Sequence, residues 1–233
     1  MVVPCFNEAR LIEPFVQELL RVESATRILL VDDGSEDGSA ELCSRLARRF
    51  EPRVQAILLA VNRGKNVALR TAAAQDGADV LLAHDADLPV DQGLLCELIQ
   101  RFSEAPQSFV YGSRFAAGPV KGMTFLRRWG NALVAWWVSR LLGRRITDVL
   151  CGLKALPREA LVRMPASNCR WGDLDIFFGA ADQDLTFQEA PVGFAARTAG
   201  ESKMRLFRHG LVFLGLCLKR SWSTRQRGAS SQC

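Results

Sequence analysis

The sequence has no closely spaced cysteines, no long apolar run and only two histidines. Its seven cysteines stand singly without a C-x-x-C pair, which indicates reduced thiols in a cytosolic setting rather than disulfides or a zinc site. The longest apolar run, residues 210–218, is about half of the ~18 residues that a membrane span needs. No signal peptide is visible, and the chain opens on a strand-like segment, so a short N-terminal piece is expected to be missing. The isolated His84 and His209 are expected to be structural or solvated.

The charge of the chain is mildly positive and unevenly placed. The 233 residues carry a net charge of +5, with basic side chains concentrated in residues 127–145 and 203–227. Such clusters favour phosphates, lipid headgroups or nucleic acid. Because no aromatic-rich nucleic-acid motif accompanies them, we expect no nucleic-acid partner.

Hydrophobic segments alternate with amphipathic ones in the first half, which predicts an α/β fold. Strands are expected at residues 1–3, 27–31, 54–60, 80–83 and 108–112, with helices at 10–22, 36–50, 65–76 and 91–102. Repeated strand–helix units imply a mostly parallel sheet covered by helices on both faces.

The second half is less regular. We expect a helix at 126–142, a strand at 152–156, a helix at 172–181, one or two strands within 185–197, and an amphipathic helix from about 204 to 222. The chain reads as a single domain over residues 1–222, followed by a disordered tail over 223–233.

Polar segments follow four of the predicted strands, at residues 4–8, 32–35, 62–65 and 85–87. In parallel sheets, ligands bind beyond the carboxyl ends of the strands. Asp85 and Asp87 are two residues apart in extended chain and point the same way, so their charges favour a cation between them. Mg²⁺ or Mn²⁺ bridging phosphate oxygens fits, which suggests a nucleotide-diphosphate site. On the motif alone, a solvated or structural pair remains equally open.

Two further loops have residue types that suit a nucleotide. Gly34 permits a tight turn, and Ser35 or Asp37 can cap the next helix. Asp33 is the stronger candidate for hydrogen bonds to a nucleobase or ribose. Residues 62–66 enter a helix N-terminus, where backbone N–H groups suit a phosphate, although a solvated loop explains Lys65 as well.

Several motifs together resemble a known family. Val3-Pro4-x-x-Asn7-Glu8, Val31-Asp32-Asp33-Gly34-Ser35, Asn62-Arg63-Gly64-Lys65 and Asp85-Ala86-Asp87-Leu88 match, in order, the inverting family-2 glycosyltransferases of GT-A fold. The later segments Gly112-Ser113-Arg114, Thr147-Asp148-x-x-Cys151-Gly152-x-Lys154, Trp171-Gly172-x-Leu174-Asp175 and Gly200-Glu201-Ser202-Lys203 resemble the dolichyl- or polyprenyl-phosphate hexosyltransferases. The resemblance covers about residues 1–205.

The resemblance implies roles for individual residues in binding the nucleotide sugar. The implied donor-binding residues are Pro4, Asn7, Glu8, Asp33, Gly64, Lys65 and Lys203, with Lys203 closing over the diphosphate. Asp85 would face the nucleotide or sugar, and Asp87, with Asp85, would form the Mg²⁺ or Mn²⁺ site. The family often has Gln as a further metal ligand where this chain has Pro89, which puts the strength of metal binding in doubt.

The resemblance also implies an acceptor site. Arg114 and one of Arg127 and Arg128 would grip the lipid phosphate. Asp148 would orient an arginine or act near the acceptor, and a structural acid at a helix end is the alternative. A sugar hydroxyl needs a general base, whereas a phosphate monoester, with its second pKa near ~6, is largely ionised at pH 7. The arginine-rich second half fits the phosphate.

A stripe of aromatic and aliphatic residues recurs at helical spacing: Trp129, Leu133, Trp136, Trp137 and Leu141. Core packing explains such a stripe, but the flanking arginines and the lipid acceptor favour a membrane interface.

We therefore expect a metal-dependent inverting transferase that moves a hexose from a nucleotide diphosphate sugar, of the UDP-glucose or GDP-mannose type, to a polyprenyl or dolichyl phosphate. It would act at the cytoplasmic membrane face. Many relatives carry C-terminal transmembrane helices, which this chain lacks, so attachment would be peripheral or through a membrane partner subunit. The alternatives are a family-2 transferase with a hydroxyl acceptor in surface polysaccharide synthesis, or a catalytically weak sugar-nucleotide-binding protein.

Overall fold

A computed structural model describes residues 1–21, 27–87, 89–116, 118, 120, 122–165, 172–193, 213, 215–218 and 220. The described strands are β1 (Val2–Cys5), β2 (Ile28–Asp32), β3 (Val54–Leu58), β4 (Val80–Ala83), β5 (Ser108–Ser113), β6 (Lys154–Pro157) and β7 (Thr186–Pro191). The helices are α1 (Ala9–Arg21), α2 (Ser39–Arg49), α3 (Lys65–Gln75), α4 (Gln92–Glu104), α5 (Phe125–Leu142), α6 (Arg158–Arg163) and α7 (Asp173–Asp182).

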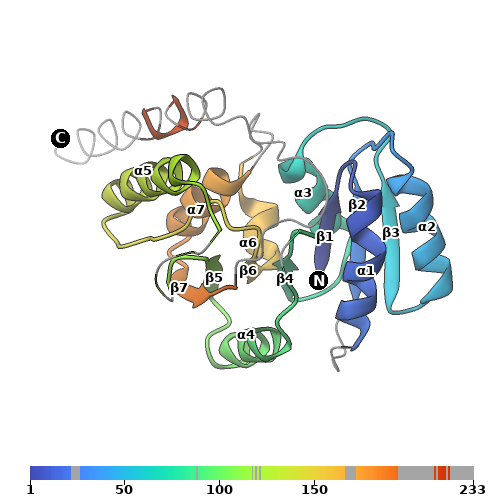
Figure 1. Cartoon of the computed structure of the whole chain (residues 1–233). Coiled ribbons are helices and arrows are strands. Elements are labelled where there is room, and N and C mark those ends of the chain that lie inside the picture. Colours follow the sequence, from blue (N-terminus) through green and yellow to red (C-terminus); the bar gives the residue numbers. More distant parts are fainter. Residues whose placement is uncertain are drawn as a thin grey trace.

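The strands form one seven-stranded sheet in the order β3-β2-β1-β4-β6-β5-β7 (Figure 1). The pairs β3-β2, β2-β1, β1-β4 and β5-β7 are parallel. Only β6 runs against its neighbours, β4 and β5. The predicted α/β fold with a mostly parallel sheet is therefore confirmed, with one reversed strand that the sequence does not reveal.

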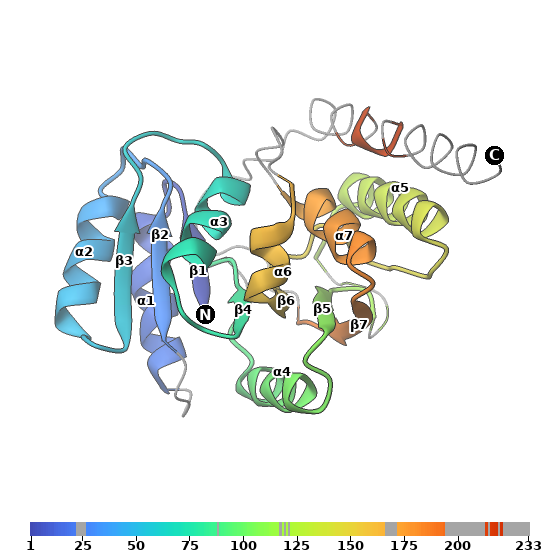
Figure 2. The same cartoon turned by 180° about the vertical axis from the view of Figure 1, so that it is seen from behind.

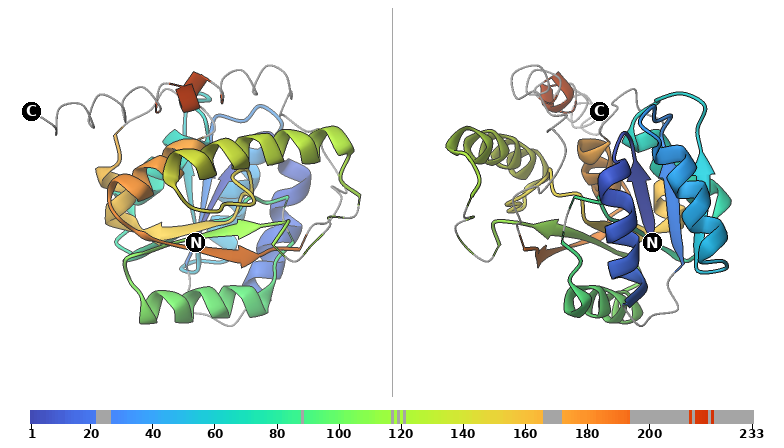
Figure 3. Two further views of the ribbon diagram at one scale, coloured as in Figure 1. Left: turned by 90° about the vertical axis from the view of Figure 1, so that its left-hand side faces the viewer. Right: turned by 45° about the vertical axis from the view of Figure 1, so that its right-hand side comes forward.

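Helices cover both faces of the sheet, as Figure 3 shows for α4 and α5 on opposite sides. Alternate residues of each strand enter two separate cores: Leu29 and Val31 of β2 face one core, and Ile28 and Leu30 face the other. The first core is closed by α3, α5, α6 and α7, of which α3, α6 and α7 are seen in front in Figure 2. The second is closed by α1, α2 and α4. Burial alternates in this way because successive side chains along a strand point to opposite faces of the sheet.

The expected elements of the first half agree with the structure to within a few residues, and β4 has the expected bounds. The sequence analysis missed α6, a helix of six residues that directly follows β6. Of the expected C-terminal helix, Phe213, residues 215–218 and Arg220 are described and helical. The remainder of that helix and the expected tail at 223–233 lie outside the described residues.

Candidate functional site

The loops that follow β1 and β2 are tied together at the carboxyl edge of the sheet. The Asn7 amide donates to Ser35 Oγ at 2.8 Å, and the Glu36 amide donates to Asn7 Oδ1 at 2.9 Å. Asp37 accepts from the Ala9 amide at 3.1 Å through one oxygen and from the Ser39 amide at 3.0 Å through the other. The N-cap of α2 is Gly38, whose position has no side-chain cap. Ser35 therefore holds the neighbouring loop instead of capping the helix, whereas Asp37, one residue before the N-cap, accepts from the first amide of α2 as well as from the Ala9 amide.

Asp33 is buried and connects β2 to the loop before α3. Its two carboxylate oxygens accept hydrogen bonds from the amides of Arg63 and Gly64 at 2.8 and 2.7 Å. Gly34 allows this approach, since a Cβ there would lie 2.5 Å from the Val61 carbonyl carbon. The structure thus gives Asp33 a loop-holding contact that the sequence analysis did not foresee. It also brings the predicted Pro4–Glu8, Asp33 and Gly64–Lys65 segments to the same edge.

The Asp85 carboxylate lies between a lysine and a glycine. Its Oδ1 is 2.7 Å from Lys65 Nζ. On its other side, a Cβ on Gly152 would lie 2.1 Å from Asp85 Oδ2, so the backbone at Gly152 packs directly on the carboxylate. Burial disfavours the charged form of Lys65, but Asp85 and Asp173 outweigh it and raise the Lys65 pKa above its ordinary value. Lys65 is therefore a cation at neutral pH.

A buried ion pair lies behind Lys65, and the sequence analysis missed it. Lys154 Nζ is 2.6 Å from Asp173 Oδ1 and donates to the Cys151 carbonyl at 2.5 Å. The same Asp173 oxygen is 3.9 Å from Lys65 Nζ. Lys154 begins the reversed strand β6 and Asp173 begins α7, so the second half of the chain reaches the Asp85 loop through these charges. The only sequence signals were single charged residues inside the C-G-L-K and G-D-L-D segments.

Arg114 is fixed by Asp148 at the end of β5. Arg114 Nε and Nη2 donate to the two oxygens of the buried Asp148 at 2.7 and 2.9 Å. Asp148 also accepts from the amides of Arg114 and Leu150 at 3.2 and 3.1 Å. Burial opposes the guanidinium charge, but Asp148 and, more weakly, Asp87 raise the Arg114 pKa above its ordinary value. Asp87 also contributes, more weakly than the directly paired carboxylates, to raising the pKa of both Arg114 and Lys65.

The other predicted acceptor and donor residues lie apart from this network or outside the description. Arg127 and Arg128 are exposed in the first turn of α5. Lys203, with the rest of its G-E-S-K loop, lies outside the described residues, as does Trp171.

The tryptophan stripe of α5 divides between solvent and core. Trp129, Leu133 and Trp136 are 57%, 44% and 60% exposed. Trp137 and Leu141 are partly buried and pack against the core. Core packing therefore holds for Trp137 and Leu141, while membrane contact by the exposed part of the stripe stays a prediction.

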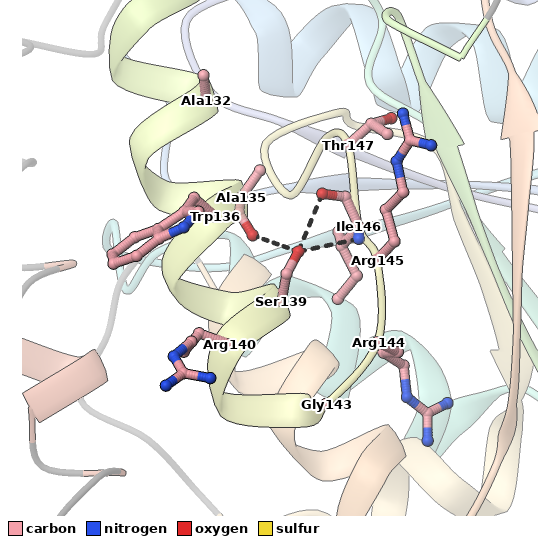
Figure 4. Close-up of a pocket in the computed structure, with 10 residues that line it drawn as sticks. All are labelled: Ala132, Ala135, Trp136, Ser139, Arg140, Gly143, Arg144, Arg145, Ile146 and Thr147. Carbon is pink, nitrogen blue, oxygen red and sulfur yellow. Dashed lines mark hydrogen bonds between the residues drawn. The ribbon is translucent and has the colours of Figure 1, made fainter.

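A groove of about 610 Å³ lies between α5 and the loop that follows it (Figure 4). Ser139 Oγ holds that loop by accepting from the Ile146 amide at 2.9 Å. The groove is lined by Ala132, Ala135, Trp136, Ser139, Arg140, Gly143, Arg144, Arg145, Ile146 and Thr147. The three arginines spread in different directions, and Arg144 stacks 4.2 Å above the Phe187 ring. Thr147, the last of these lining residues in the chain, directly precedes Asp148.

Within the described ranges, no three His, Cys, Asp or Glu side chains gather closely enough to hold a metal ion unaided. Two carboxylates, those of Asp85 and Asp87, remain as hard oxygen ligands beside the loop before α3. Mg²⁺ is commonly held by one or two carboxylates together with substrate phosphates, so this donor set fits a metal that arrives with a diphosphate. No helix among the described residues is both long and apolar enough to cross a membrane.

Comparisons with known proteins agree with the predicted family and fold. Glycosyl transferase family 2 matches residues 1–155. Undecaprenyl-phosphate 4-deoxy-4-formamido-L-arabinose transferase of Pseudomonas fluorescens (strain Pf0-1) is 32% identical over 214 residues, which are 87% of this chain and 59% of that protein. This chain thus spans about three fifths of the length of such curated relatives.

Two solved structures share the fold. Glucosyl-3-phosphoglycerate synthase from Mycobacterium tuberculosis, in complex with Mn²⁺, uridine-diphosphate-glucose and phosphoglyceric acid, superposes with a TM-score of 0.73 at 18% identity, covering 94% of this chain and 78% of that one. Mannosyl-3-phosphoglycerate synthase from Rubrobacter xylanophilus gives a TM-score of 0.65 at 18% identity, covering 97% and 74%. These likenesses confirm the expected GT-A-like α/β fold. The match over residues 1–155, more than half of the chain, shows that the chain belongs to glycosyl transferase family 2.

Proposed function

We propose that this protein transfers a hexose, with inversion, from a nucleotide diphosphate sugar to the phosphate of a polyprenol or dolichol at the cytoplasmic face of a membrane. The name of the Pseudomonas relative, an undecaprenyl-phosphate transferase, supports the lipid phosphate as acceptor. The complex of the mycobacterial neighbour with Mn²⁺ and uridine-diphosphate-glucose supports a nucleotide sugar donor and a divalent metal. UDP-glucose and GDP-mannose are the donor types to test.

The observation that carries the proposal is that three carboxylates in and behind the candidate site are each ion-paired. Asp85 pairs with Lys65, Asp148 with Arg114, and Asp173 with Lys154. A carboxylate that a cation already holds is a poor general base. An acceptor hydroxyl needs such a base, whereas an ionised phosphate does not. The pairing therefore favours a phosphate acceptor.

In this mechanism the protein binds and orients the two substrates and neutralises their negative charge. Asp148 fixes two nitrogens of the Arg114 fork, which leaves Nη1 to bind the acceptor phosphate. An oxygen of that phosphate attacks the anomeric carbon as the bond from this carbon to the donor diphosphate breaks, and no proton has to be removed. Asp85 and Asp87 would hold Mg²⁺ or Mn²⁺, which neutralises the diphosphate when bound. Pro89 offers no ligand there, so water or donor phosphate would complete the coordination. Lys203 would close over the diphosphate.

Attachment to the membrane would be peripheral, through α5. Its exposed face carries Phe125, Leu126, Trp129, Leu133 and Trp136. The surrounding stretch, residues 105–147, contains seven Lys or Arg residues and no Asp or Glu. Exposed tryptophan and cationic side chains without acids suit an anionic lipid surface. A membrane partner subunit would add to this attachment.

The test is transfer of radiolabel into the organic phase. Purified protein, Mn²⁺ and a short polyprenyl phosphate are incubated with UDP-glucose and GDP-mannose separately. We expect transfer from one donor, lost in Asp87→Ala and kept in Glu159→Ala, which removes an exposed acid on α6. Mn²⁺-dependent donor hydrolysis without transfer would indicate another acceptor, such as a sugar hydroxyl. Donor binding without transfer or hydrolysis would favour a catalytically weak sugar-nucleotide-binding protein, and absence of donor binding would overturn the proposal.

A further inference from the structure

Four charged side chains form a chain from the core to the Asp85 loop. Lys154 holds Asp173, Asp173 lies near Lys65, and Lys65 holds Asp85, with N–O distances of 2.6, 3.9 and 2.7 Å. Lys154 and Asp173 are both buried, whereas Lys65 and Asp85 are 16% and 32% exposed at their side chains. The outer pair is therefore the part that a ligand can reach.

Lys65 Nζ lies 2.7 Å from Asp85 Oδ1, so a divalent cation that bound this oxygen would have to compete with the ammonium. Two cations repel each other strongly at such separations, and they cannot both contact Asp85 Oδ1. A cation that entered at Asp85 would therefore repel the Lys65 ammonium, and Asp173, whose Oδ1 already lies 3.9 Å from Lys65 Nζ, is the acidic group beside it.

We propose that Lys65 is the resting counter-ion of Asp85, that a divalent cation displaces it, and that Asp173, held by Lys154, receives the displaced ammonium. Asp173 and Lys154 are then positioning residues that act through Lys65 rather than groups that touch the substrate. The inference rests on the metal dependence of the proposed function and adds two residues to which the family motifs give no role here. It also explains why Lys154 is buried beside Asp173. Without Lys154, the unbalanced negative charge of Asp173 would draw Lys65 away from Asp85.

The experiment measures Mn²⁺ binding rather than turnover. The electron paramagnetic resonance signal of free Mn²⁺ is titrated with protein, without donor sugar and then with UDP or GDP. Lys65→Met removes the competing cation, so we expect Mn²⁺ to bind about three- to tenfold more tightly in the absence of nucleotide. Arg63→Met removes an exposed positive charge two residues before Lys65, and we expect less than about a twofold change from it.

A double-mutant cycle then separates positioning from direct ligation. Asp173→Asn removes the alternative partner of Lys65, so Mn²⁺ should bind several-fold more weakly. In the Lys65→Met background the same substitution should have little effect, because Asp173 acts only through Lys65. Persistence of the full Asp173→Asn effect in that background would overturn the inference, as would unchanged or weaker Mn²⁺ binding by Lys65→Met.

Asp173→Asn leaves Lys154 buried without its partner, which threatens folding. The double variant Lys154→Met/Asp173→Asn removes both charges and should weaken Mn²⁺ binding as Asp173→Asn does, with folding checked by circular dichroism. If it binds Mn²⁺ as the unmodified protein does, the inference fails. If the unmodified protein binds no Mn²⁺ even with UDP or GDP, the metal dependence of the proposed function fails with it. If it binds Mn²⁺ but the variants do not differ, only the present inference fails.

Discussion

Arg114 and Asp148 are joined by two parallel hydrogen bonds of 2.7 and 2.9 Å, although 34 residues separate them in the chain. The pair joins the end of β5 to the loop before β6 and fixes the plane of the guanidinium. Planar, bidentate contact is what distinguishes arginine from lysine in binding carboxylates and phosphates.

Arg114→Lys keeps the charge but loses this fork. Loss of a hydrogen bond to a charged group costs about 1.5–3 kcal/mol, so we expect kcat/KM for the polyprenyl phosphate to fall by about ten- to a hundredfold. The KM for the nucleotide sugar should change little. Steady-state kinetics with each substrate varied in turn measures both, and Arg163→Lys, in an exposed helical ion pair with Glu159, is the control. An equal effect on both substrates would contradict a specific role at the acceptor.

Gly152→Ala should disturb Asp85 directly. The added Cβ would lie 2.1 Å from Asp85 Oδ2, so either the carboxylate or the loop before β6 has to move. We expect at least about a tenfold loss of transfer activity, equivalent to about 1.4 kcal/mol in the barrier. Gly77→Ala is the matched control, because no atom lies within 4 Å of its added Cβ. Normal activity in Gly152→Ala would show that the position of Asp85 is not critical.

Trp129→Ser/Trp136→Ser should weaken attachment to lipid without unfolding the protein. Both rings are more than half exposed, so their removal exposes little core. Each ring that enters a membrane interface contributes apolar burial, and we expect about tenfold or greater loss of binding to vesicles containing anionic lipid. Vesicle sedimentation measures this, with Val162→Ser, an exposed apolar residue on α6, as the control. Unchanged sedimentation would remove α5 from the proposed docking surface.

Cys151 and Cys96 should differ sharply in reactivity. Burial, and then the nearby Asp148 carboxylate, raise the pKa of the Cys151 thiol to about 11. Because the thiolate is the reactive form, Cys151 should resist iodoacetamide at pH 7. Cys96 is exposed and should be alkylated first. Peptide mapping by mass spectrometry during brief labelling tests this order, and early modification of Cys151 would mean that the region around Asp148 opens readily.

The sequence predicts best where structure is locally encoded. The run at residues 80–83 predicted β4 with the observed bounds, because four apolar residues between polar loops leave few alternatives. The six-residue α6 was missed, since so short a helix is stabilised by its contacts rather than by a repeating pattern.

Contacts between distant segments were harder to predict. The motifs predicted Lys65 and Asp85 as candidate site residues, but nothing local indicated that they would pair with each other. Asp173 and Lys154 are 19 residues apart on separate elements and are joined only by tertiary packing. Their pairing could not be read from spacing. Asp33 was expected to contact a nucleotide, and its bonds to the Arg63 and Gly64 amides became evident only once the two loops were brought together.

Because β6 runs antiparallel to its neighbours, the two halves of the chain contribute different residues to the candidate site. A parallel strand would bring its carboxyl end to the site, but β6 brings its beginning there, so the segment that precedes it, residues 143–153, supplies Asp148 and Gly152. Under the proposed function, changes of length or composition in that one segment would alter which acceptor is bound, while the β1–β4 half that presents Asp33 and Asp85 stays unchanged. Replacing this single connection would then be a route to a different acceptor.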